Sequence, residues 1–422
     1  MFSFCSHDQR EIHARPDRIE RLYIDFDSFY ASAEQHLDPA LVGRPVGVIP
    51  IESRSTSLIA ASREAKRFGV KTHTPLREAL RLLPDLVVRV ARPDVYVRLH
   101  HEIRAVVDSV VPILAVRSID EMVCALLENE AARGADLARA VKDGLRRAFG
   151  PALTASIGLA ANERLAKIAA EMEKPDGFVR LDPDTLPGRL LDVPLGDIPG
   201  IGERMATRLA RAGVTDMPAL WALAPKQMRA LWGSVEGERL WYELHGYEVI
   251  REATETGMFS HGRVLAGDWR TPERQRDCAR LLLGKAARRM RRAGFSARRL
   301  TLSIKGETGG RWHGEAPLPD ARDDFTLLHA LDGLFARAAR QTAPARARGV
   351  AVSLSDLVAS DTREAGLFPG ADDAARGRRE RLADVVDALH ARHGRTSSPS
   401  ASNRRCPAAT PAARSPSDGS RT

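Results

Sequence analysis

The run Arg21-Leu-Tyr-Ile-Asp-Phe-Asp27 alternates like a β-strand and ends in carboxylates. A second acidic cluster, Ser118-Ile-Asp-Glu121, stands between two further strand-like runs. Carboxylates at the ends of buried strands are costly to hold together unless cations neutralise them. The two clusters therefore predict a site at the end of a sheet, where their carboxylates meet around cations. The alternative, which fits either cluster alone, is a solvated strand end and a hairpin turn.

The oxygen ligands of these clusters suit magnesium. Mg²⁺ binds one or two carboxylates together with the phosphates of a substrate. Two such ions can hold the attacking and leaving oxygens of an in-line phosphoryl displacement. If the fold brings the two clusters together, they predict a site for phosphoryl transfer.

Length and composition predict a globular protein of several domains. The chain has 422 residues, with 28% charged and 43% apolar residues, which suggests about three domains. Its first residues lack the basic and apolar regions of a signal peptide, and no apolar run approaches the ~20 residues of a membrane span. The four cysteines are scattered, which argues against zinc and disulfides and predicts a cytoplasmic location.

Positive charge is concentrated in one part of the chain. Residues 261–360 contain 19 Lys and Arg against 10 Asp and Glu, an excess of nine that equals the net charge of the whole chain. Within them, the segment 274–299 holds ten basic residues and one acid. A phosphate-rich partner would release counterions on binding such a segment, so the pattern predicts nucleic acid binding. The alternative is a solvated helix face.

Strand-like and helical runs alternate through the first part of the chain and predict an α+β sheet with helices on one face. The expected strands are 21–25, 45–49, 86–90, 113–117, 122–127, 153–159 and 178–181. The expected helices are 28–36, 62–68, 75–83, 94–110, 131–149 and 162–173.

The rest of the chain has three parts. Residues 186–247 predict helices only, and a polar linker follows. A second αβ segment comes next, with expected helices at 272–293 and 323–340 and strands at 299–305 and 350–354. At the end, a short helix at 378–393 is expected to pack its apolar side on a core, through Leu382, Val385, Val386 and Leu389.

Several motifs follow one another in an order that closely resembles the Y-family translesion DNA polymerases, the DinB / DNA polymerase IV and UmuC (ImpB/MucB/SamB) group. The resemblance covers roughly residues 21–368. Besides the two acidic clusters, the motifs are Ser28-Phe-Tyr-Ala-Ser-Ala-Glu34, Leu41-Val-Gly-Arg-Pro-Val-Gly-Val48, Ala60-Ala-Ser-Arg-Glu-Ala-Lys-Arg-Phe-Gly-Val70, Thr154-Ala-Ser-Ile-Gly158, Leu165-Ala-Lys-Ile-Ala169 and Lys174-Pro-Asp-Gly177.

The resemblance implies an α+β right-hand fold with a ferredoxin-like palm, small fingers, a helical thumb with a helix-hairpin-helix, and an αβ little-finger domain. The expected order is a leader (1–20), a palm and fingers catalytic domain (21–182, with fingers at about 28–87), a thumb (183–249), a linker (250–258), a little finger (259–360) and a C-terminal tail (361–422). The tail is expected to be mostly disordered after residue 394.

The resemblance also implies catalytic roles. Asp25, Asp120 and Glu121 match the family's metal-binding carboxylates, which hold two Mg²⁺ ions, and the carbonyl of Phe26 would complete the shell of one ion. Asp27 is expected to support the site by hydrogen bonding.

A nucleotide site is implied beside the metals. Tyr30 matches the aromatic gate that excludes a 2′-hydroxyl, and Phe29, directly before it, is expected to contact the nucleotide. From the residues alone, Tyr30 is a packed core tyrosine. Lys167 matches a triphosphate-binding lysine. Asn162 either caps the same helix or faces the pocket.

The chain departs from the family pattern at two places. Arg63 and Lys66 stand where the family usually has the tyrosine and arginine that hold the triphosphate. This keeps positive charge but changes geometry, because an ammonium is a point charge and a guanidinium a planar fork. Met122-Val-Cys124 also replaces the usual Ala-Tyr-Leu, which indicates a divergent subgroup.

Two elements are expected to bind primer-template DNA without reading base edges. The first is the helix-hairpin-helix around Gly200, Gly202 and Arg204, where backbone N–H groups can approach a phosphate. The second is the basic helix of the little finger, with Lys285, Arg288, Arg289, Arg291 and Arg292. A sliding clamp is a further expected partner, through Leu367 and Phe368; the alternative is a Leu-Phe pair that folds back on the surface.

These observations predict a monomeric DNA polymerase of the translesion type that adds dNTPs to a primer. The second hypothesis is an ImuB-like accessory subunit that keeps the fold without catalysis. The retained carboxylates Asp25, Asp120 and Glu121 favour the enzyme, whereas Arg63 and Lys66 favour the accessory subunit. A nucleotide cyclase on a related palm is a third hypothesis, which leaves the helix-hairpin-helix and the basic segment unexplained.

Overall fold

The computed structural model describes residues 15–53, 56–251, 256–341, 343–360 and 371–393. It divides the chain into two compact units. Described residues before the break at 252–255 form the first unit, except 51–53, which group with the second unit. Leu367, Phe368 and the segment after residue 393 lie outside the described residues.

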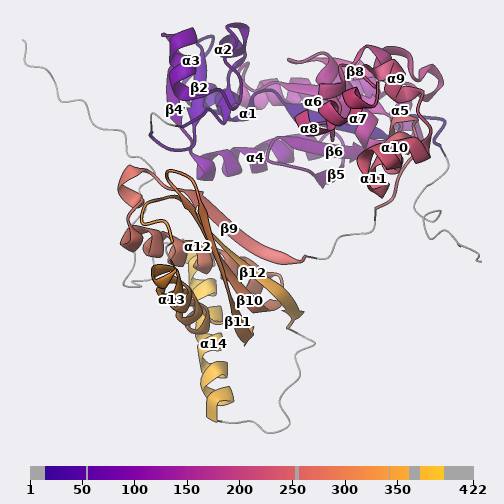
Figure 1. The fold of residues 1–422 in the computed structure, drawn as a ribbon. Helices are drawn as coiled ribbons and strands as arrows, with labels where there is room; N and C mark the ends of the chain where they lie inside the picture. The colour runs from indigo at the N-terminus through magenta and orange to yellow at the C-terminus, as the bar shows by residue number, and fades with distance from the viewer. Residues whose placement is uncertain (1–14, 54–55, 252–255, 342, 361–370, 394–422) are drawn as a thin grey trace, which may run out of the picture. The chain divides into compact units, whose positions relative to one another are not determined.

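A five-stranded sheet with the order β5-β6-β1-β7-β8 forms the centre of the first unit (Figure 1). Strand β1 pairs antiparallel with both β6 and β7, and β7 pairs parallel with β8. The carboxyl end of β1 thus lies inside the sheet, between two neighbours. The strands are β1 (Arg21–Phe26), β5 (Ile113–Val116), β6 (Glu121–Ala125), β7 (Ala155–Ala160) and β8 (Phe178–Arg180).

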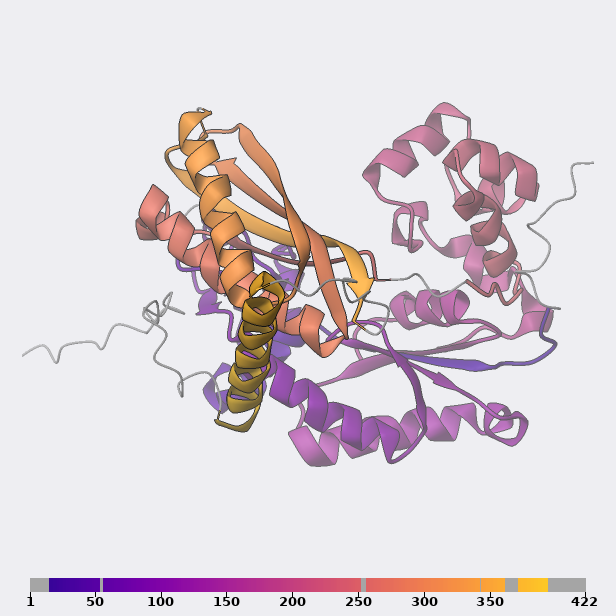
Figure 2. The same ribbon diagram turned by 90° about the horizontal axis from the view of Figure 1, so that it is seen from below.

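Helices cover both faces of this sheet, which corrects the expectation of one covered face (Figure 2). Helices α4 (Pro93–Asp108) and α6 (Gly134–Phe149) pack on one face and α7 (Glu163–Met172) on the other. The physical reason lies in the alternation of the inner strands. Leu22 faces α4 and α6 while its neighbour Tyr23 faces α7, and both are buried.

Helix α7 lies unusually close to β7 because Gly158 has no side chain. A Cβ on Gly158 would lie 2.0 Å from the carbonyl oxygen of Ala166 and 2.5 Å from the amide nitrogen of Ala170. Only glycine permits this approach. The contact fixes the height of α7, and with it Lys167, over the sheet.

A small sheet with the order β3-β2-β4 forms a separate part of the first unit, with its own core. Its strands are β2 (Val46–Ile49), β3 (Ala60–Ala61) and β4 (Val87–Val90), and its helices are α2 (Arg63–Arg67) and α3 (Leu76–Leu82). Helix α1 (Phe29–Leu37) begins directly after the acidic end of β1, and η2 (Pro39–Leu41) follows it. The expected helix 131–149 is divided at Arg133 into α5 (Glu128–Ala132) and α6.

The last part of the first unit consists of short helices that pack on α7. They are η3 (Pro183–Thr185), η4 (Gly188–Asp192), η5 (Leu195–Asp197), α8 (Glu203–Arg211), α9 (Met217–Trp221), α10 (Pro225–Trp232) and α11 (Val235–Leu244).

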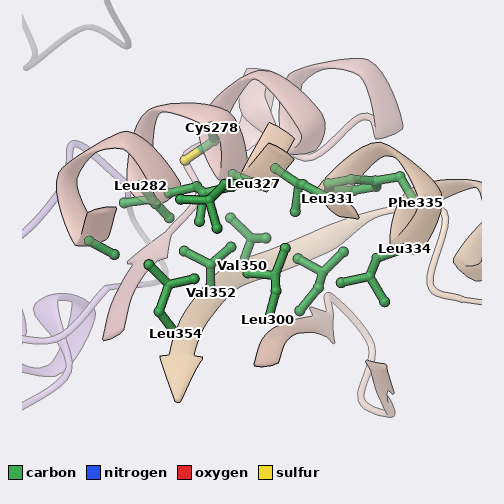
Figure 3. Close-up of a cluster of buried hydrophobic side chains, with 14 of the residues drawn as sticks. Cys278, Leu282, Leu300, Leu327, Leu331, Leu334, Phe335, Val350, Val352 and Leu354 are labelled. Atoms are coloured by element: carbon green, nitrogen blue, oxygen red, sulfur yellow. The ribbon is translucent and has the colours of Figure 1, made fainter. Parts of the chain in front are cut away.

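The second unit is an antiparallel sheet with the order β11-β10-β12-β9. Helices α12 (Pro272–Arg292) and α13 (Asp324–Arg340) share one core with one face of the sheet, and Figure 3 shows its side chains pointing toward one another. The strands are β9 (Met258–Val264), β10 (Phe295–Gly306), β11 (Arg311–Ala321) and β12 (Ala347–Ala359), and η6 (Gly267–Trp269) precedes α12. The sequence analysis missed the edge strands β9 and β11. Strand β11 carries Pro317 and Pro319, which edge strands tolerate.

Helix α14 (Ala371–His393) contradicts the expectation that its apolar side packs on a core. The exposed fractions are 57% for Leu382, 56% for Val385 and 43% for Leu389. The opposite side is docked instead, through Ala383 and the carboxylate of Asp387. The reason is the basic surface that receives the helix, which favours its acidic side.

Among the described residues, no helix has the length and apolar character that crossing a membrane requires.

Candidate active site

The sheet register brings the two acidic clusters together. Asp25 lies directly opposite Glu121 in the β1–β6 pairing. The amide of Phe26 donates a hydrogen bond of 2.9 Å to the carbonyl oxygen of Asp120. The three predicted carboxylates therefore stand on adjacent strands at one end of the sheet.

Each of these carboxylates has its own partner. The Lys174 ammonium lies 2.7 Å from Oδ1 of Asp25. Lys167 pairs with Glu121, and the Ser118 hydroxyl lies 2.5 Å from Oδ1 of Asp120. Within the described part of the chain, no group of three or more His, Cys, Asp or Glu side chains is arranged to hold a metal ion. The acids are thus neighbours along the backbone; the Ser118 hydroxyl contacts both Asp120 and Glu121, whereas Asp25 pairs with Lys174.

The donors at this end of the sheet nevertheless fit a hard divalent ion by their chemistry. All are oxygens, and Asp25 is nearly buried. Burial raises the pKa of Asp25, while Lys174 acts to lower it. Two lysine ammonium groups lie against these carboxylates, which shows that the cluster attracts positive charge.

Asp27 has the supporting role that the sequence predicted. Its Oδ2 accepts hydrogen bonds from the Thr154 hydroxyl at 2.7 Å and the Asp176 amide at 2.8 Å. Its Oδ1 accepts from the Ser156 hydroxyl at 2.9 Å. A buried carboxylate with three donors ties β1 to β7 and to the loop after Lys174.

Lys174 is the main residue that the sequence analysis did not assign. It lies before the loop that Asp27 holds, and its ammonium contacts both Asp25 and Glu171. Burial lowers the pKa of Lys174, but the two carboxylates more than compensate and leave it raised. The motif Lys174-Pro-Asp-Gly177 could have indicated this role, because a turn directly after a lysine fixes the position of its backbone.

Tyr30 is half-buried and rests on a fixed support. Its ring centroid lies 4.9 Å from that of Tyr96. The Tyr96 hydroxyl donates to Oε1 of the buried Glu34 at 2.7 Å, and Nε of Arg92 donates to the same oxygen at 3.0 Å. Burial, with a smaller effect of the Asp120 charge, raises the pKa of Tyr30. The phenol therefore lies near the acidic cluster.

The side chain of Phe29, which the sequence analysis assigned to the nucleotide site, is turned into the core. It is 2% exposed and packs in the core that lies between the sheet and α4 and α6. Phe29 lies on the side of α1 that faces the core, so its aromatic ring is buried among apolar side chains. Only its backbone is left to contact a ligand.

The three predicted phosphate-binding cations differ in their surroundings. Lys167 lies 5.5 Å from the Tyr23 ring centroid in addition to its pairing with Glu121. Desolvation and the neighbouring Lys174 lower the pKa of Lys66, and the charges of nearby acids, Asp25 among them, partly oppose this. Lys66 is thus close enough to feel the acidic cluster. Arg63 is half-buried at the start of α2, where its charge helps to lower the pKa of Glu64.

Asn162 is the N-cap of α7, which decides between its two interpretations. Its Oδ1 accepts from the Leu165 amide at 2.9 Å, and its Nδ2 donates to the carbonyls of Glu243 and Tyr247 at 2.8 Å each. Arg164 adds an ion pair with Glu243. The helix that carries Lys167 is thereby tied to α11.

The glycine turn before α8 is exposed, and Arg164 of α7, which pairs with Glu243 of α11, also contacts it. Gly200 has φ +101°, a conformation that favours glycine, and Gly202 is the N-cap of α8. Arg164 donates to the Pro199 carbonyl at 2.8 Å. Within this described turn no side chain caps α8, so its first amides are directed to solvent, next to the exposed Arg204.

The basic residues of α12 are not equivalent. Arg291 was predicted to contact DNA, but its side chain is 3% exposed and pairs with Asp324 and Asp387. This buried cation holds the unit together, which corrects the prediction. Arg288 pairs with Asp387 and is half-buried, as is Lys285. Arg289 and Arg292 are exposed.

The second unit has another polar surface that the sequence analysis missed. It is the sheet face opposite α12 and α13, here called the open face, on which no described helix of the unit packs. Small and hydroxyl side chains line it between cations. By the strand registers it contains Arg299, Thr301, Ser303 and Lys305 of β10, Ser353 and Ser355 of β12, and Ser260 and Gly262 of β9.

We predict that Asp27→Asn loosens the loop that follows Lys174. The amide nitrogen of Asn cannot accept a hydrogen bond, so at least one of the three donors loses its partner, at a cost of about 1–3 kcal/mol. Hydrogen exchange at the Asp176 amide should accelerate by about 5-fold or more. Thr154→Val, which removes one donor and leaves the carboxylate, should give a smaller change. Unchanged exchange in Asp27→Asn would contradict the supporting role.

Known proteins match this chain over most of its length. The impB/mucB/samB family matches residues 24–171, and the C-terminal domain of the same family matches residues 258–367. A DNA polymerase IV of Moorella thermoacetica is 33% identical over 383 residues, which cover 88% of this chain and 93% of the relative. A DNA polymerase IV of Streptomyces coelicolor is 29% identical over 81% of this chain and 72% of its own length.

Solved structures show the same fold. A chimeric Y-family DNA polymerase built on Dbh aligns with a TM-score of 0.68 and 21% identity, over 81% of this chain and 99% of its own. DinB from Sulfolobus solfataricus aligns with a TM-score of 0.53 and 22% identity, over 80% and 98% of the two chains. Together, the two matched domains, the relatives and the shared α+β fold show that this chain belongs to the impB/mucB/samB family as a DinB-like Y-family DNA polymerase.

Proposed function

We propose that this translesion DNA polymerase adds deoxynucleotides to a primer at the acidic end of β1 and β6. The observation that carries the proposal is the pairing of Asp25 with Glu121, with Asp120 next to it in the chain. These carboxylates and the Phe26 carbonyl would hold two Mg²⁺ ions. When bound, the ions would lower the pKa of the primer 3′-hydroxyl and balance the charge of the triphosphate.

The lysines around the acids would bind the triphosphate of the incoming nucleotide. Lys174 and Lys167 each contact one of the carboxylates, and Lys66 is near Lys174. An ammonium can turn from a carboxylate toward a phosphate, because it is a point charge on a flexible stem. The first amides of α1, those of Phe29 and Tyr30, offer further donors to a phosphate at a helix N-terminus.

Tyr30 would select the sugar. Its ring cannot yield toward Tyr96, because Glu34 and Arg92 hold the Tyr96 side chain from the other side. A rigid aromatic face beneath the sugar leaves no room for a 2′-hydroxyl.

In structural terms we assign the palm to the five-stranded sheet with α4, α6 and α7, the fingers to the small sheet, and the thumb to α8–α11. The second unit would be the little finger. The enzyme is proposed to act as a cytoplasmic monomer, and a clamp contact at Leu367 and Phe368 stays a prediction because both residues lie outside the described chain.

DNA would be bound without sequence preference at two places. One is the turn at Gly200 and Gly202 with Arg204, where exposed amides and a cation suit a phosphate. The other is the open face, where small residues allow close approach and hydroxyls, Arg299 and Lys305 suit the sugar–phosphate backbone. Ion pairs of Arg299 with Glu315 and Asp356 are exposed and therefore weak.

The alternative function is a DNA-binding accessory subunit. Arg63 and Lys66 favour it, because they replace the usual triphosphate ligands. The retained acids favour catalysis, because a structural domain gains nothing from clustered carboxylates that need cations.

We predict that Asp120→Ala abolishes primer extension. Loss of one carboxylate from the cluster should lower single-nucleotide insertion in dNTPs and Mg²⁺ on the order of a thousandfold or more. Binding of primer-template DNA should persist. The control Asp136→Ala removes an exposed carboxylate of α6 and should insert normally. A wild-type protein that binds primer-template but inserts nothing would establish the accessory function instead.

For the sugar gate, Tyr30→Ala should admit ribonucleotides. Removing the ring opens space for a 2′-hydroxyl, and the preference for dCTP over CTP should fall about 100-fold. Tyr30→Phe keeps the ring and should keep the preference, measured as the ratio of kcat/KM values. Equal sugar discrimination in the wild type and Tyr30→Ala would remove the gate assignment.

To separate the two basic surfaces of the second unit, we predict that Arg299→Ala with Lys305→Ala weakens DNA binding more than Arg289→Ala with Arg292→Ala. Both pairs remove two exposed positive charges, so net charge is matched. Each lost phosphate contact should reduce the slope of log affinity against log salt by about 1. The measurement is fluorescence anisotropy of primer-template at several salt concentrations. A larger effect of the α12 pair would place DNA on the helices.

A further inference from the structure

Helix α14 lies beyond the region that matches the family's C-terminal domain. It contacts α13 and is held to the second unit through charges. Arg291 of α12 is the centre of this attachment, with Nε 2.7 Å from Oδ2 of Asp387. Arg322 adds a hydrogen bond of 2.6 Å to Asp384.

This attachment determines which side of α14 faces outward. A buried arginine needs a fixed carboxylate, because removing one partner of a buried pair is strongly destabilising. Asp387, which shares Arg291 with Asp324, points inward, and Asp384 lies on the same flank. Within the described part of the second unit, the side of α14 opposite Asp387 is left exposed.

The outward side carries an apolar stripe, defined by Leu382, Val385 and Leu389. The three side chains are all exposed, and their spacing of i, i+3 and i+7 places them on one face. Fully burying a side chain of this size is worth about 1.5–3 kcal/mol. This spacing is the one with which helices bind apolar grooves.

Arginines flank the stripe at both ends. Arg378 lies one turn before Leu382 on the same line, and Arg381 and Arg392 border the stripe; all three are exposed. We propose that α14 is a docking helix for another protein, whose apolar groove with an acidic rim takes the stripe. The inference is independent of the polymerase chemistry proposed above.

Two other occupants fit the stripe less well. In an antiparallel pair of two α14 helices, Arg378 of one copy would lie near Arg392 of the other, and like charges repel. A helix that lies on a membrane carries a wide apolar face with Trp or Phe. This stripe is narrow and aliphatic. A protein groove with carboxylates at its edge would bury the aliphatic side chains of the stripe and pair with its arginines.

The test starts from the full chain with a photoreactive p-benzoylphenylalanine at position 385, irradiated in cells, with the same label at position 391 as control. The captured protein is identified, purified and titrated against unlabelled variants. Val385→Glu should weaken its binding about 10-fold or more, and Arg378→Glu with Arg392→Glu similarly. Phe325→Glu changes an exposed apolar residue of α13 and should have no effect.

Each contrary outcome overturns the proposal. These are no capture above the position 391 control, capture of only a second copy of this chain, or a captured protein whose affinity Val385→Glu leaves unchanged. Binding to phosphatidylcholine–phosphatidylglycerol vesicles that Val385→Glu abolishes would assign the stripe to a membrane instead. Hydrogen exchange over residues 375–392 checks that Val385→Glu keeps α14 docked, with Asp387→Asn as the variant expected to release it.

Discussion

The charge balance at the end of β1 and β6 is the constraint on which the proposed active site depends. The sheet register places Asp25 directly opposite Glu121. Asp120 precedes Glu121 in the chain, and its carbonyl oxygen accepts a hydrogen bond from the Phe26 amide. A buried carboxylate such as Asp25 requires a cation nearby. Lys174 and Lys167 meet this requirement. Lys167 comes from α7, which packs on the sheet, and Lys174 from the loop that follows α7.

The surrounding structure fixes those lysines through contacts that are not themselves catalytic. Gly158 lets α7 approach β7, and Asn162 ties the start of that helix to α11. Asp27 holds the loop after Lys174 in the same way. The position of each ammonium thus depends on packing and hydrogen bonds in several elements. A change in any of them would act on the site without touching a substrate.

The sequence predicted the residues of this site better than their environments. Strand alternation indicated that the acidic clusters lie at strand ends, and the resemblance to the Y-family polymerases selected Asp25, Asp120 and Glu121; the register that pairs Asp25 with Glu121 came from the structure. The sequence could not show that Phe29 and Arg291 are buried, since burial depends on which face of a helix meets a neighbour. Nor could apolar spacing alone orient α14, where a buried ion pair outweighs the usual preference of leucine for the interior.

The replacement of the family's tyrosine and arginine by Arg63 and Lys66 is consistent with the same requirement for positive charge near the acids. In this chain the charges nearest the acids belong to lysines, and desolvation together with Lys174 lowers the pKa of Lys66. A polyanion that binds between neighbouring lysines reduces the repulsion between their positive charges. A triphosphate would therefore be held here by the sum of compact charges, whereas a guanidinium fork would fix its geometry. Such a pocket would attract the nucleotide and would hold it in a less fixed orientation.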